Sequence, residues 1–419
     1  MSTKYKVGSL FAGVGGVCLG FKNASYKEKE YEMIWANEMD EFACETYRTN
    51  FSHTLIQGDI NKVLNPEIID EEILSKKRSL NSLDGISETK YIKEIEKLEE
   101  EKNSYVLKHK QILSEKIDIL LGGFPCQAFS IAGERKGFED DRGNLFLSII
   151  NLINQLDQIH GKPRVLFLEN VKNLKGHDGG RTYQVIKSEL EKIGYIIKEH
   201  VLNTMDYTDL PQNRERIYII GFLNKEDADK FELFDAIDNS GKVLIEKMKK
   251  HKSKEDRIND IRRIIRYDLT RTEAEKYYYT REKYPNYFLA QEEYDNLPLD
   301  VKKDERVNLD EQINEFYEFY QVRRGMYVRK NKSGVCPTLT ANMGTGGHNV
   351  PLIKVNDGIR KLTPEEVFKL QGFPVGKGYK LPTKYNGRAY SDAQLYKQAG
   401  NAVSVPIIEL LAKNIIKIL

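Results

Sequence analysis

Short apolar runs alternate with amphipathic stretches along the first half of the chain, up to Phe222. The runs have the length of buried strands, whereas stretches such as 145–153 and 183–190 repeat their apolar residues at helical spacing. Strands alternating with helices predict an α/β fold with a doubly wound, mostly parallel sheet, whose ligands bind at the carboxyl ends of the strands. The predicted strands are residues 7–11, 31–36, 53–56, 117–121, 164–168, 195–197 and 216–220.

Two stretches interrupt this alternation. Residues 65–116 are rich in Lys and Glu, and their apolar residues recur at helical spacing, which predicts a charged helical insertion. We interpret it as a solvated excursion without chemistry, with a binding role as the alternative. From residue 223 to Cys336 strand-like and helix-like stretches no longer alternate, and the sequence is rich in Tyr and charged residues. This change predicts a second, smaller domain.

The C-terminal part returns to helical patterns. Thr363 and Pro364 are the residue types of a helix N-cap and first turn, for a helix that ends at Leu370. A last helix at 405–418 has a broad apolar face, and we expect it to pack on the first domain. The predicted organisation is a first domain at residues 1–222 that carries the insertion, a second domain at 223–375 and a C-terminal segment at 376–419 that returns to the first domain.

Composition and charge narrow the class of protein. Of the 419 residues, 40% are hydrophobic and 31% charged, a balance typical of globular proteins. No run approaches the roughly 20 apolar residues of a transmembrane helix, and no signal peptide precedes the first strand, so we predict a cytoplasmic protein. Basic and acidic residues number 65 and 63, so any surface for nucleic acid must be local. The cysteines form no C-x-x-C pair, which argues against disulfides or a cysteine zinc site, and no metal is predicted; they are Cys18, Cys44, Cys126 and Cys336.

A glycine-rich loop, Phe11–Gly16, follows the first predicted strand. Glycines allow a sharp turn and close approach of a ligand, but the spacing is not the dinucleotide-binding G-x-G-x-x-G. Glu38 ends the second strand, where an acid typically binds the ribose hydroxyls, and Asp59 follows the third strand, a position suited to an adenine amino group. Either acid alone would more often be a helix cap. Together with the loop they favour a nucleoside-bearing cofactor, and since the sequence has no phosphate-binding P-loop, S-adenosylmethionine fits best.

The fourth and fifth predicted strands end in residues capable of covalent chemistry. Cys126 lies in Gly122–Gln127, and a loop at a strand end is where the pKa of a thiol can fall enough to make it a nucleophile. A lone cysteine is usually a small buried residue, but the flanking Gly, Pro and Gln disfavour burial here. Glu169 supplies a carboxylate at the adjacent strand end, where it can act as a general acid. Arg214 and Arg216 share one face of the next strand and could bind a carboxylate or a base carbonyl. These side chains together suit covalent attack on an electron-poor ring.

In their order along the chain, these motifs resemble those of the DNA cytosine C5-methyltransferases. The resemblance covers nearly all of the chain except the insertion and the middle of the second domain. One motif would be weak evidence, whereas the ordered series is specific, and the compact chain without regulatory domains resembles bacterial type II restriction–modification methylases. The matching motifs are Phe11–Gly16, Asn37–Asp40, Gly58–Ile60, Gly123–Gln127, Arg142–Phe146, Leu168–Val171, Gln212–Arg216, Leu362–Glu366, Leu370–Pro374 and Gln398–Val403.

The resemblance implies catalytic roles for four residues. Cys126 would add to C6 of a cytosine flipped out of the duplex, and Glu169 would hydrogen-bond N3 and the exocyclic amine as negative charge develops. Arg214 and Arg216 would orient the cytosine O2 and the Cys126–Glu169 pair. A water or another base would remove the C5 proton before Cys126 leaves by β-elimination.

The resemblance also implies S-adenosylmethionine as the cofactor. The glycine loop would cover its methionine part, Glu38 its ribose, and Met39, Asp59 and Ile60 its adenine. The C-terminal segment would close the pocket, in agreement with a last helix that docks on the first domain. The full predicted set is Phe11, Gly13, Gly15, Gly16, Glu38, Met39, Asp59, Ile60, Pro125, Leu145, Asn401 and Val403.

Double-stranded DNA is the implied partner, bound by a monomer at the nucleoid without an obligatory protein partner. A loop at 128–141, with Gly133 and Gly137 as hinges, is expected to close over the target base, with a static linker as the alternative. Residues 242–266 carry ten basic and four acidic residues, and 321–332 carry five basic and no acidic ones. Phosphate contact is their expected role, and a solvated charged face is the alternative. The predicted DNA contacts are Gln127, Ser130, Arg135, Lys136, Arg323, Arg324, Thr338 and Leu339.

Other functions fit less well. RNA cytosine C5-methyltransferases, as a family, carry their nucleophile at the end of the fifth strand, which here holds Glu169 and Asn170 and no cysteine. A tRNA-modifying enzyme on the DNA-type scaffold is disfavoured by the large second domain with its basic patches. Intact Cys126, Glu169 and Arg216 disfavour a protein that only binds DNA. The missing third glycine disfavours an NAD-dependent oxidoreductase.

Overall fold

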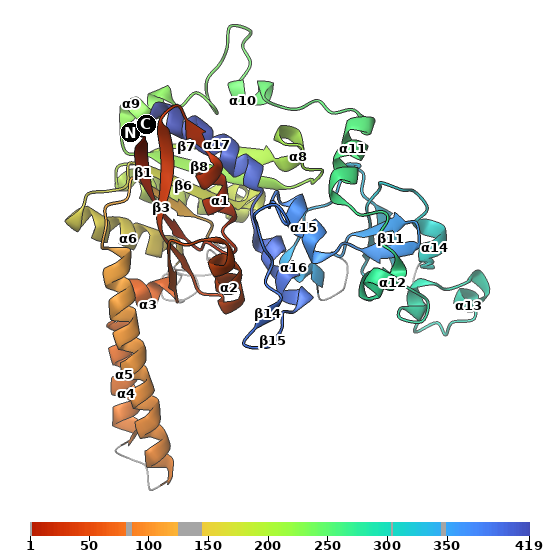
Figure 1. The fold of residues 1–419 in the computed structure, drawn as a ribbon, viewed down its shortest axis with the longest axis horizontal. Coiled ribbons are helices and arrows are strands. Elements are labelled where there is room, and N and C mark those ends of the chain that lie inside the picture. Colours follow the sequence, from red (N-terminus) through yellow and green to blue (C-terminus); the bar gives the residue numbers. More distant parts are fainter. Residues whose placement is uncertain (1, 81–85, 125–144, 303–304, 345–348) are drawn as a thin grey trace.

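An eight-stranded sheet forms the centre of the first half of the chain (Figure 1). The structure, a computed structural model, describes residues 2–80, 86–124, 145–302, 305–344 and 349–419. The strands of this sheet are β1 Thr3–Leu10, β2 Ser25–Tyr26, β3 Lys29–Glu38, β4 Thr54–Gln57, β5 Ile119–Gly122, β6 Val165–Val171, β7 Ile196–Asn203 and β8 Glu215–Phe222. Their order is β2-β3-β1-β5-β6-β8-β7, with β4 paired to β3.

The pairing confirms the predicted mostly parallel, doubly wound sheet. The pairs β4–β3, β3–β1, β1–β5 and β5–β6 are parallel. β8 runs antiparallel to both β6 and β7, and the short β2 runs antiparallel to β3. All seven predicted strands are present, and the unpredicted β2 is a two-residue edge strand.

Helices cover both faces of the sheet because its inner strands are apolar on both faces. Successive residues of β5 point to opposite sides, so Leu120 packs in one core and Leu121 in the other. The core around Leu120 includes side chains of α3 Ile60–Leu64, α6 Leu145–Ile159 and α7 Arg181–Lys192, and the core around Leu121 includes side chains of α1 Gly16–Asn23 and α17 Val405–Ile418. The predicted docking of the last helix on the first domain is confirmed. Outside the insertion, the remaining helices of this half are α2 Glu41–Asn50, α8 Thr204–Tyr207 and α9 Lys225–Lys230.

The contact between α1 and α17 is close because Gly20 has no side chain. A Cβ built at Gly20 would lie 2.6 Å from Cβ of Ile408. The stretch Asp392–Ile418 contains α16 Asp392–Asn401 and α17, and it has the length and mean hydropathy of a membrane span. However, 67% of its most apolar window is buried within the protein. We therefore interpret it as core structure.

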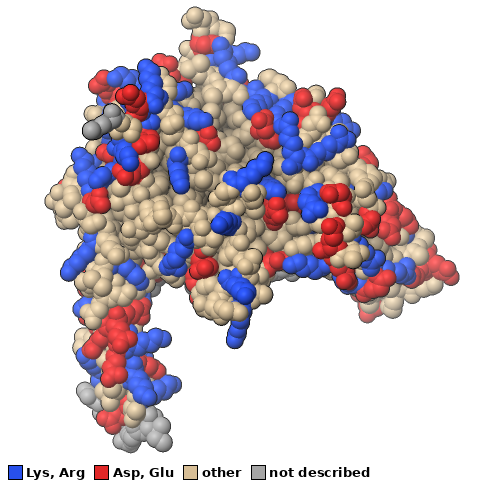
Figure 2. All heavy atoms as spheres, viewed as in Figure 1, with Lys and Arg blue, Asp and Glu red and all other residues tan. Residues whose placement is uncertain are grey.

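The predicted insertion is a helical hairpin that projects from the body of the molecule (Figure 1). It consists of α4 Ile68–Leu80 and α5 Ile86–Ile112. Ile69, Ile73 and Ile95 join the core cluster of the sheet, whereas Leu74 and Ile92 are 50% and 41% exposed. Figure 2 shows acidic and basic side chains intermixed along the visible face of the hairpin, so neither sign of charge dominates that face.

The second half of the chain is built around a five-stranded antiparallel sheet. Its strands, in the order β11-β10-β12-β13-β9, are β9 Tyr278–Tyr279, β10 Tyr320–Arg323, β11 Tyr327–Lys330, β12 Leu352–Val355 and β13 Gly358–Lys361. A small hairpin, β14 Lys384–Tyr385 and β15 Arg388–Ala389, follows it. The helices are α10 Leu244–Lys247, α11 Lys254–Ile264, α12 Arg271–Ala274, α13 Gln291–Asp295, α14 Leu309–Gln312 and α15 Pro364–Leu370. Short 3₁₀ turns lie at Lys172–Lys175, His177–Gly180, Glu275–Tyr277, Pro285–Tyr287 and Ala341–Gly344.

The two halves share a hydrophobic core, to which Val14 and Ala43 contribute from the first half and Phe368 and Phe373 from the second. This core contains residues from both sides of the domain boundaries that the sequence predicts at 222 and 375. The two boundaries therefore stay predictions.

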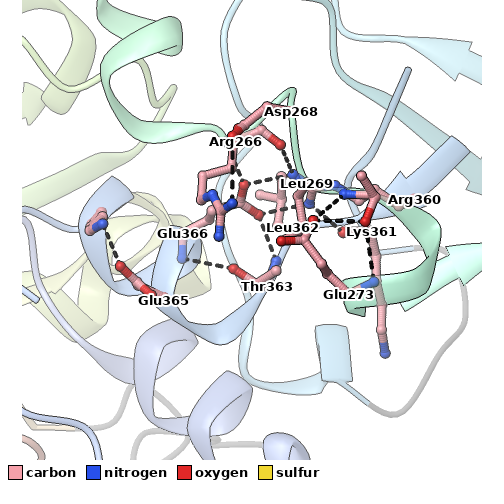
Figure 3. A network of polar contacts seen from close by, with 12 residues as sticks. Arg266, Asp268, Leu269, Glu273, Arg360, Lys361, Leu362, Thr363, Glu365 and Glu366 are labelled. Carbon is pink, nitrogen blue, oxygen red and sulfur yellow. Dashed lines mark hydrogen bonds and ion pairs between the residues drawn. The ribbon is translucent and has the colours of Figure 1, made fainter. Parts of the chain in front are cut away.

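A buried ion pair fixes α15 to the second sheet (Figure 3). Arg360 of β13 donates to both carboxylate oxygens of Glu366, at 2.8 and 2.7 Å, and neither residue is more than 2% exposed. Glu366 also accepts the backbone N–H of Arg266 at 2.9 Å and that of Thr363 at 2.8 Å. Thr363 is the N-cap of α15, as predicted, and its hydroxyl accepts the N–H of Glu366 in return.

Candidate active site

The glycine loop turns sharply between β1 and α1. Gly13 and Gly15 have φ of 54° and 84°, a region that glycine enters at little cost. A Cβ at Gly15 would overlap the ring of Phe51. The N–H of Gly13 donates to Oε2 of Glu38 at 2.7 Å, so the loop is held directly against the end of β3.

Glu38 organises the end of β3. Its Oε1 accepts the backbone N–H groups of Met39 and Asp40 at 2.9 and 2.8 Å. Burial raises the pKa of Glu38, and the hydrogen bonds from Asp40, Gly13 and Met39 oppose that rise. Met39 is 64% exposed although it is a large apolar side chain.

Asp59 caps α3, since its Oδ1 accepts the N–H of Asn61 at 2.9 Å. The cap interpretation considered for this acid is therefore correct, and the side chain also lines the cavity described below. Its neighbour Ile60 is buried. An amide missed by the sequence reasoning, Asn37, donates to the carbonyls of Ile56 and Gly58 at 2.9 and 3.0 Å and joins the ends of β3 and β4.

One cavity of about 400 Å³ runs along the carboxyl ends of the strands. It extends from the glycine loop past Glu38 and Met39 to Glu169, and the C-terminal segment supplies part of its wall. Gly15 is not among the lining residues, and Pro125 lies outside the described residues. The predicted site residues that line the cavity are Phe11, Gly13, Gly16, Glu38, Met39, Asp59, Ile60, Leu145, Glu169, Arg214, Arg216, Asn401 and Val403.

Glu169 lies at one end of this cavity, near the end of β6. Its Oε1 is 3.1 Å from Nε of Arg216, and the residue is 8% exposed. Burial raises the pKa of Glu169, and the charges of Arg216 and Arg214 oppose that rise. The adjacent Asn170, to which the sequence assigned no role, donates from Nδ2 to the carbonyl of Phe124 at 2.8 Å. It thereby ties β6 to the segment that leads towards Cys126, which itself lies outside the described residues.

Arg214 and Arg216 have different environments, although the sequence paired them. Arg214 is 2% exposed and donates to the carbonyl oxygens of Leu339 at 3.1 Å, Gly400 at 3.3 Å and Ala402. Burial lowers its pKa, and the nearby charge of Arg216 lowers it further. Arg214 thus joins the second sheet's loop and the C-terminal segment to the strand ends, whereas Arg216 faces the carboxylate.

A second hollow, of about 630 Å³, lies beside Arg216 between the first and second halves of the chain. Lys172, Lys175 and Arg329 line it together with Thr338, whose hydroxyl donates to the carbonyl of Asn213 at 2.7 Å. Three predicted DNA contacts do not line this hollow. Leu339 is fully buried, so its side chain has a packing role here. Arg323 ends β10, and Arg324 follows it in the β10–β11 turn. Gln127, Ser130, Arg135 and Lys136, with the predicted closing loop at 128–141, lie outside the described residues.

The basic patch at 242–266 is partly neutralised. Lys250 lies 2.7 Å from a carboxylate oxygen of Asp209 and Lys252 lies 2.8 Å from the same oxygen. Arg263 lies 3.2 Å from Asp260. These pairs favour the alternative of a solvated charged face for much of the patch. In the part of the chain that the structure describes, no group of three or more His, Cys, Asp or Glu could hold a metal ion.

The sheet, the glycine loop and the buried Glu169–Arg216 pair describe an α/β protein whose ligand site lies at the carboxyl ends of its strands. Comparison with known proteins gives the family. Residues 5–76 and 85–417 match the family described as C-5 cytosine-specific DNA methylase. The chain belongs to this family and is a DNA cytosine C5-methyltransferase, which confirms the expectation from its motifs.

The relatives point to the type II methyltransferases of restriction–modification systems. The chain is 40% identical over 413 residues to the Type II methyltransferase M.Bsp6I of Bacillus sp. (strain RFL6), covering 98% of each chain. It is 31% identical to M.HpaII of Haemophilus parainfluenzae, covering 99% of this chain and 90% of the relative.

Solved structures agree on the fold. Spodoptera frugiperda DNMT2 aligns with a TM-score of 0.56 at 18% identity, over 98% of this chain and 99% of that one. The Entamoeba histolytica methyltransferase EhMeth aligns with a TM-score of 0.53 at 19% identity, over 99% of both.

Proposed function

We propose that this enzyme uses S-adenosylmethionine to methylate C5 of a specific cytosine in a short duplex site, by covalent attack of Cys126 on a base flipped out of the helix. Its biological role is to protect host DNA from a cognate restriction endonuclease. It acts as a cytoplasmic monomer at the nucleoid, with residues 223–375 as the target-recognition domain. The observation that carries the proposal is that Glu169 and the glycine loop with Glu38 line one continuous cavity.

The residues of the cavity fit S-adenosylmethionine. The volume of about 400 Å³ lies within the range typical of small-ligand sites. Met39 is exposed beside Glu38, so a flat adenine could cover it. The carboxylate of Glu38 accepts three backbone N–H groups, and since a carboxylate has about four lone-pair sites, it retains capacity for a ribose hydroxyl. When bound, the cofactor would supply an electrophilic methyl group.

The chain's own residues would carry the covalent steps. The Cys126 thiolate forms a bond to C6 of cytosine, and the electron pair of the C5–C6 double bond moves into the ring, where Glu169 stabilises it by hydrogen bonding at N3. C5 becomes nucleophilic, and the bound cofactor would supply the methyl group to it, keeping the electron pair of the broken C–S bond on its own sulfur. A base then removes the proton from C5, and the electrons of that C–H bond restore the C5–C6 double bond as the Cys126 sulfur leaves. The raised pKa of Glu169 suits it to hold a proton near N3.

The test is transfer of labelled methyl from S-adenosylmethionine to unmethylated duplex DNA. Wild type should label C5 of cytosine, Cys126→Ala should not, and the control Cys336→Ala, which removes a buried thiol outside the cavity, should remain active. With DNA containing 5-fluorocytosine, wild type should form a stable covalent complex, because the fluorine at C5 cannot leave as a proton does. Transfer to tRNA instead of DNA would overturn the proposed substrate, and transfer by Cys126→Ala would overturn the covalent mechanism.

A further inference from the structure

The helical insertion contacts the wall of the cavity that holds Gly58 and Asp59. Tyr105 of α5 accepts the backbone N–H of Asp59 on its hydroxyl oxygen at 3.2 Å. A Cβ built at Gly58 would lie 2.9 Å from the Tyr105 ring, and φ of Gly58 is 153°. Tyr105 is itself only 9% exposed, so the ring is packed against the segment rather than lying on the surface.

Further contacts join the hairpin to α3, which begins directly after Asp59. His109 of α5 lies with Nδ1 3.0 Å from the carbonyl oxygen of Val63. Lys62 of α3 donates to Glu101 of α5 at 3.1 Å and lies 3.4 Å from Glu72 of α4. Several contacts therefore fix the hairpin to α3 and to Asp59, which precedes α3. Among these contacts, that of Tyr105 is made to Asp59, which lines the cavity.

The segment Gly58–Asp59 separates two hollows. On one side it lines the cavity with Glu38, and on the other it lines a hollow of about 630 Å³. Tyr105 and Lys108 of α5 line this outer hollow, with Nζ of Lys108 4.4 Å from the Tyr105 ring centroid. Because the outer side is hollow, the position of the segment depends on the few groups that touch it, and Tyr105 is one of them.

We propose that the helical insertion is a positioning element for the adenine end of the cofactor, and that Tyr105 is the residue through which it acts. The proposal rests on the proposed use of S-adenosylmethionine. Tyr105 fixes the backbone of Gly58 and Asp59, and the side chain of Asp59 then faces the adenine in a fixed place. The insertion is thus part of the binding site and more than a solvated excursion.

The experiment compares wild type with Tyr105→Phe, which keeps the ring and removes only the hydroxyl. We measure the Kd of S-adenosylmethionine without DNA by calorimetry, and steady-state kcat and KM for both substrates. Loss of one hydrogen bond should raise the Kd and the KM for S-adenosylmethionine about three- to tenfold, with kcat within about twofold and the KM for DNA unchanged. Leu107→Ala, which shortens a side chain on α5 that is 62% exposed, should change none of these values.

Hydrogen exchange in the free protein gives an independent readout. Tyr105→Phe should speed exchange locally, at the amides of 58–64, and leave β5 and β6 unchanged. Equal Kd values for wild type and Tyr105→Phe would overturn this proposal alone, as would a general rise in exchange with an unchanged KM, which would mean a merely structural role. Failure of wild type to bind S-adenosylmethionine would instead overturn the proposed function.

Discussion

Oε1 of Glu169 lies 3.1 Å from Nε of Arg216, across the antiparallel pair β6–β8 in which Val171 is opposite Arg216. Both side chains are nearly buried, at 11% and 13% exposure. Two opposing effects act on the carboxyl group: removal from water favours its neutral form, and the guanidinium favours its charged form. Burial has the larger effect, so the pKa of Glu169 is raised.

This raised pKa predicts how stability depends on pH. The folded protein holds the Glu169 proton more tightly than the unfolded chain, in which the pKa of this carboxyl is about 4.3. The contribution of this group to the free energy of unfolding is therefore fully present below about pH 4.3 and is lost as the pH rises through the folded pKa. In Glu169→Gln that dependence is absent. Urea unfolding of both proteins from about pH 4 to 7 should show the wild type losing stability relative to the variant as the pH rises.

The opposite slope would contradict this interpretation. If wild type gained stability relative to Glu169→Gln with rising pH, the attraction of Arg216 would outweigh burial, and the group would be held as a carboxylate. The comparison uses the difference between the two proteins, so titration of other carboxyl groups cancels.

A second prediction concerns Met39, whose side chain is 64% exposed next to Glu38. Met39→Ala should leave the free energy of unfolding of the free protein within about 0.5 kcal/mol of wild type, because little packing is lost. It should weaken S-adenosylmethionine binding about tenfold, since burying part of a Met side chain under a ligand is worth on the order of 1–2 kcal/mol. Calorimetric titration and thermal unfolding measure the two quantities.

Met248→Ala is the matched control for this prediction. Met248 is also exposed, at 39%, but it follows α10 and is not among the residues that line the cavity. The control should change neither quantity. Equal affinity of Met39→Ala and wild type would mean that the adenine does not lie on Met39.

The inner strands could be predicted from the sequence because they are apolar on both faces. A continuous apolar run such as that of β5 is recognisable in the sequence without knowing which elements pack against it. The antiparallel direction of β8 could not be predicted, because strand direction depends on the connections between elements rather than on local composition. The hairpin was predicted by its helical spacing, but its contact with Asp59 was not.

The site shows the same division. Acids at strand ends are visible in sequence, so Glu38, Asp59 and Glu169 were identified together. The hydrogen bonds of Arg214 could not be predicted, since they depend on the carbonyl of Leu339, 125 residues further along the chain, and that of Ala402, 188 residues further. Asn37 lies in a motif that was recognised, yet its bonds to Ile56 and Gly58 depend on which strand lies alongside β3.

The third prediction concerns the ion pair between Arg360 and Glu366, which are 0% and 2% exposed. Glu366→Gln would leave the guanidinium buried without its counter-charge, and we expect it to lower the free energy of unfolding by about 3–5 kcal/mol. Glu365→Gln is the control, because Glu365 pairs with Lys369 on the exposed side of the same helix. This substitution should cost less than about 1 kcal/mol. Urea unfolding measures both.

The double variant Arg360→Met, Glu366→Gln tests whether the cost comes from the unpaired charge. Arg360→Met removes the buried cation, so the second substitution no longer leaves a charge without its partner. The double variant should then lose less stability than the sum of the two single variants, by at least about 1 kcal/mol. Strict additivity would show that Glu366 acts mainly through the backbone N–H groups of Arg266 and Thr363. In that case the capping of α15, rather than the ion pair, would be what fixes this helix to the second sheet.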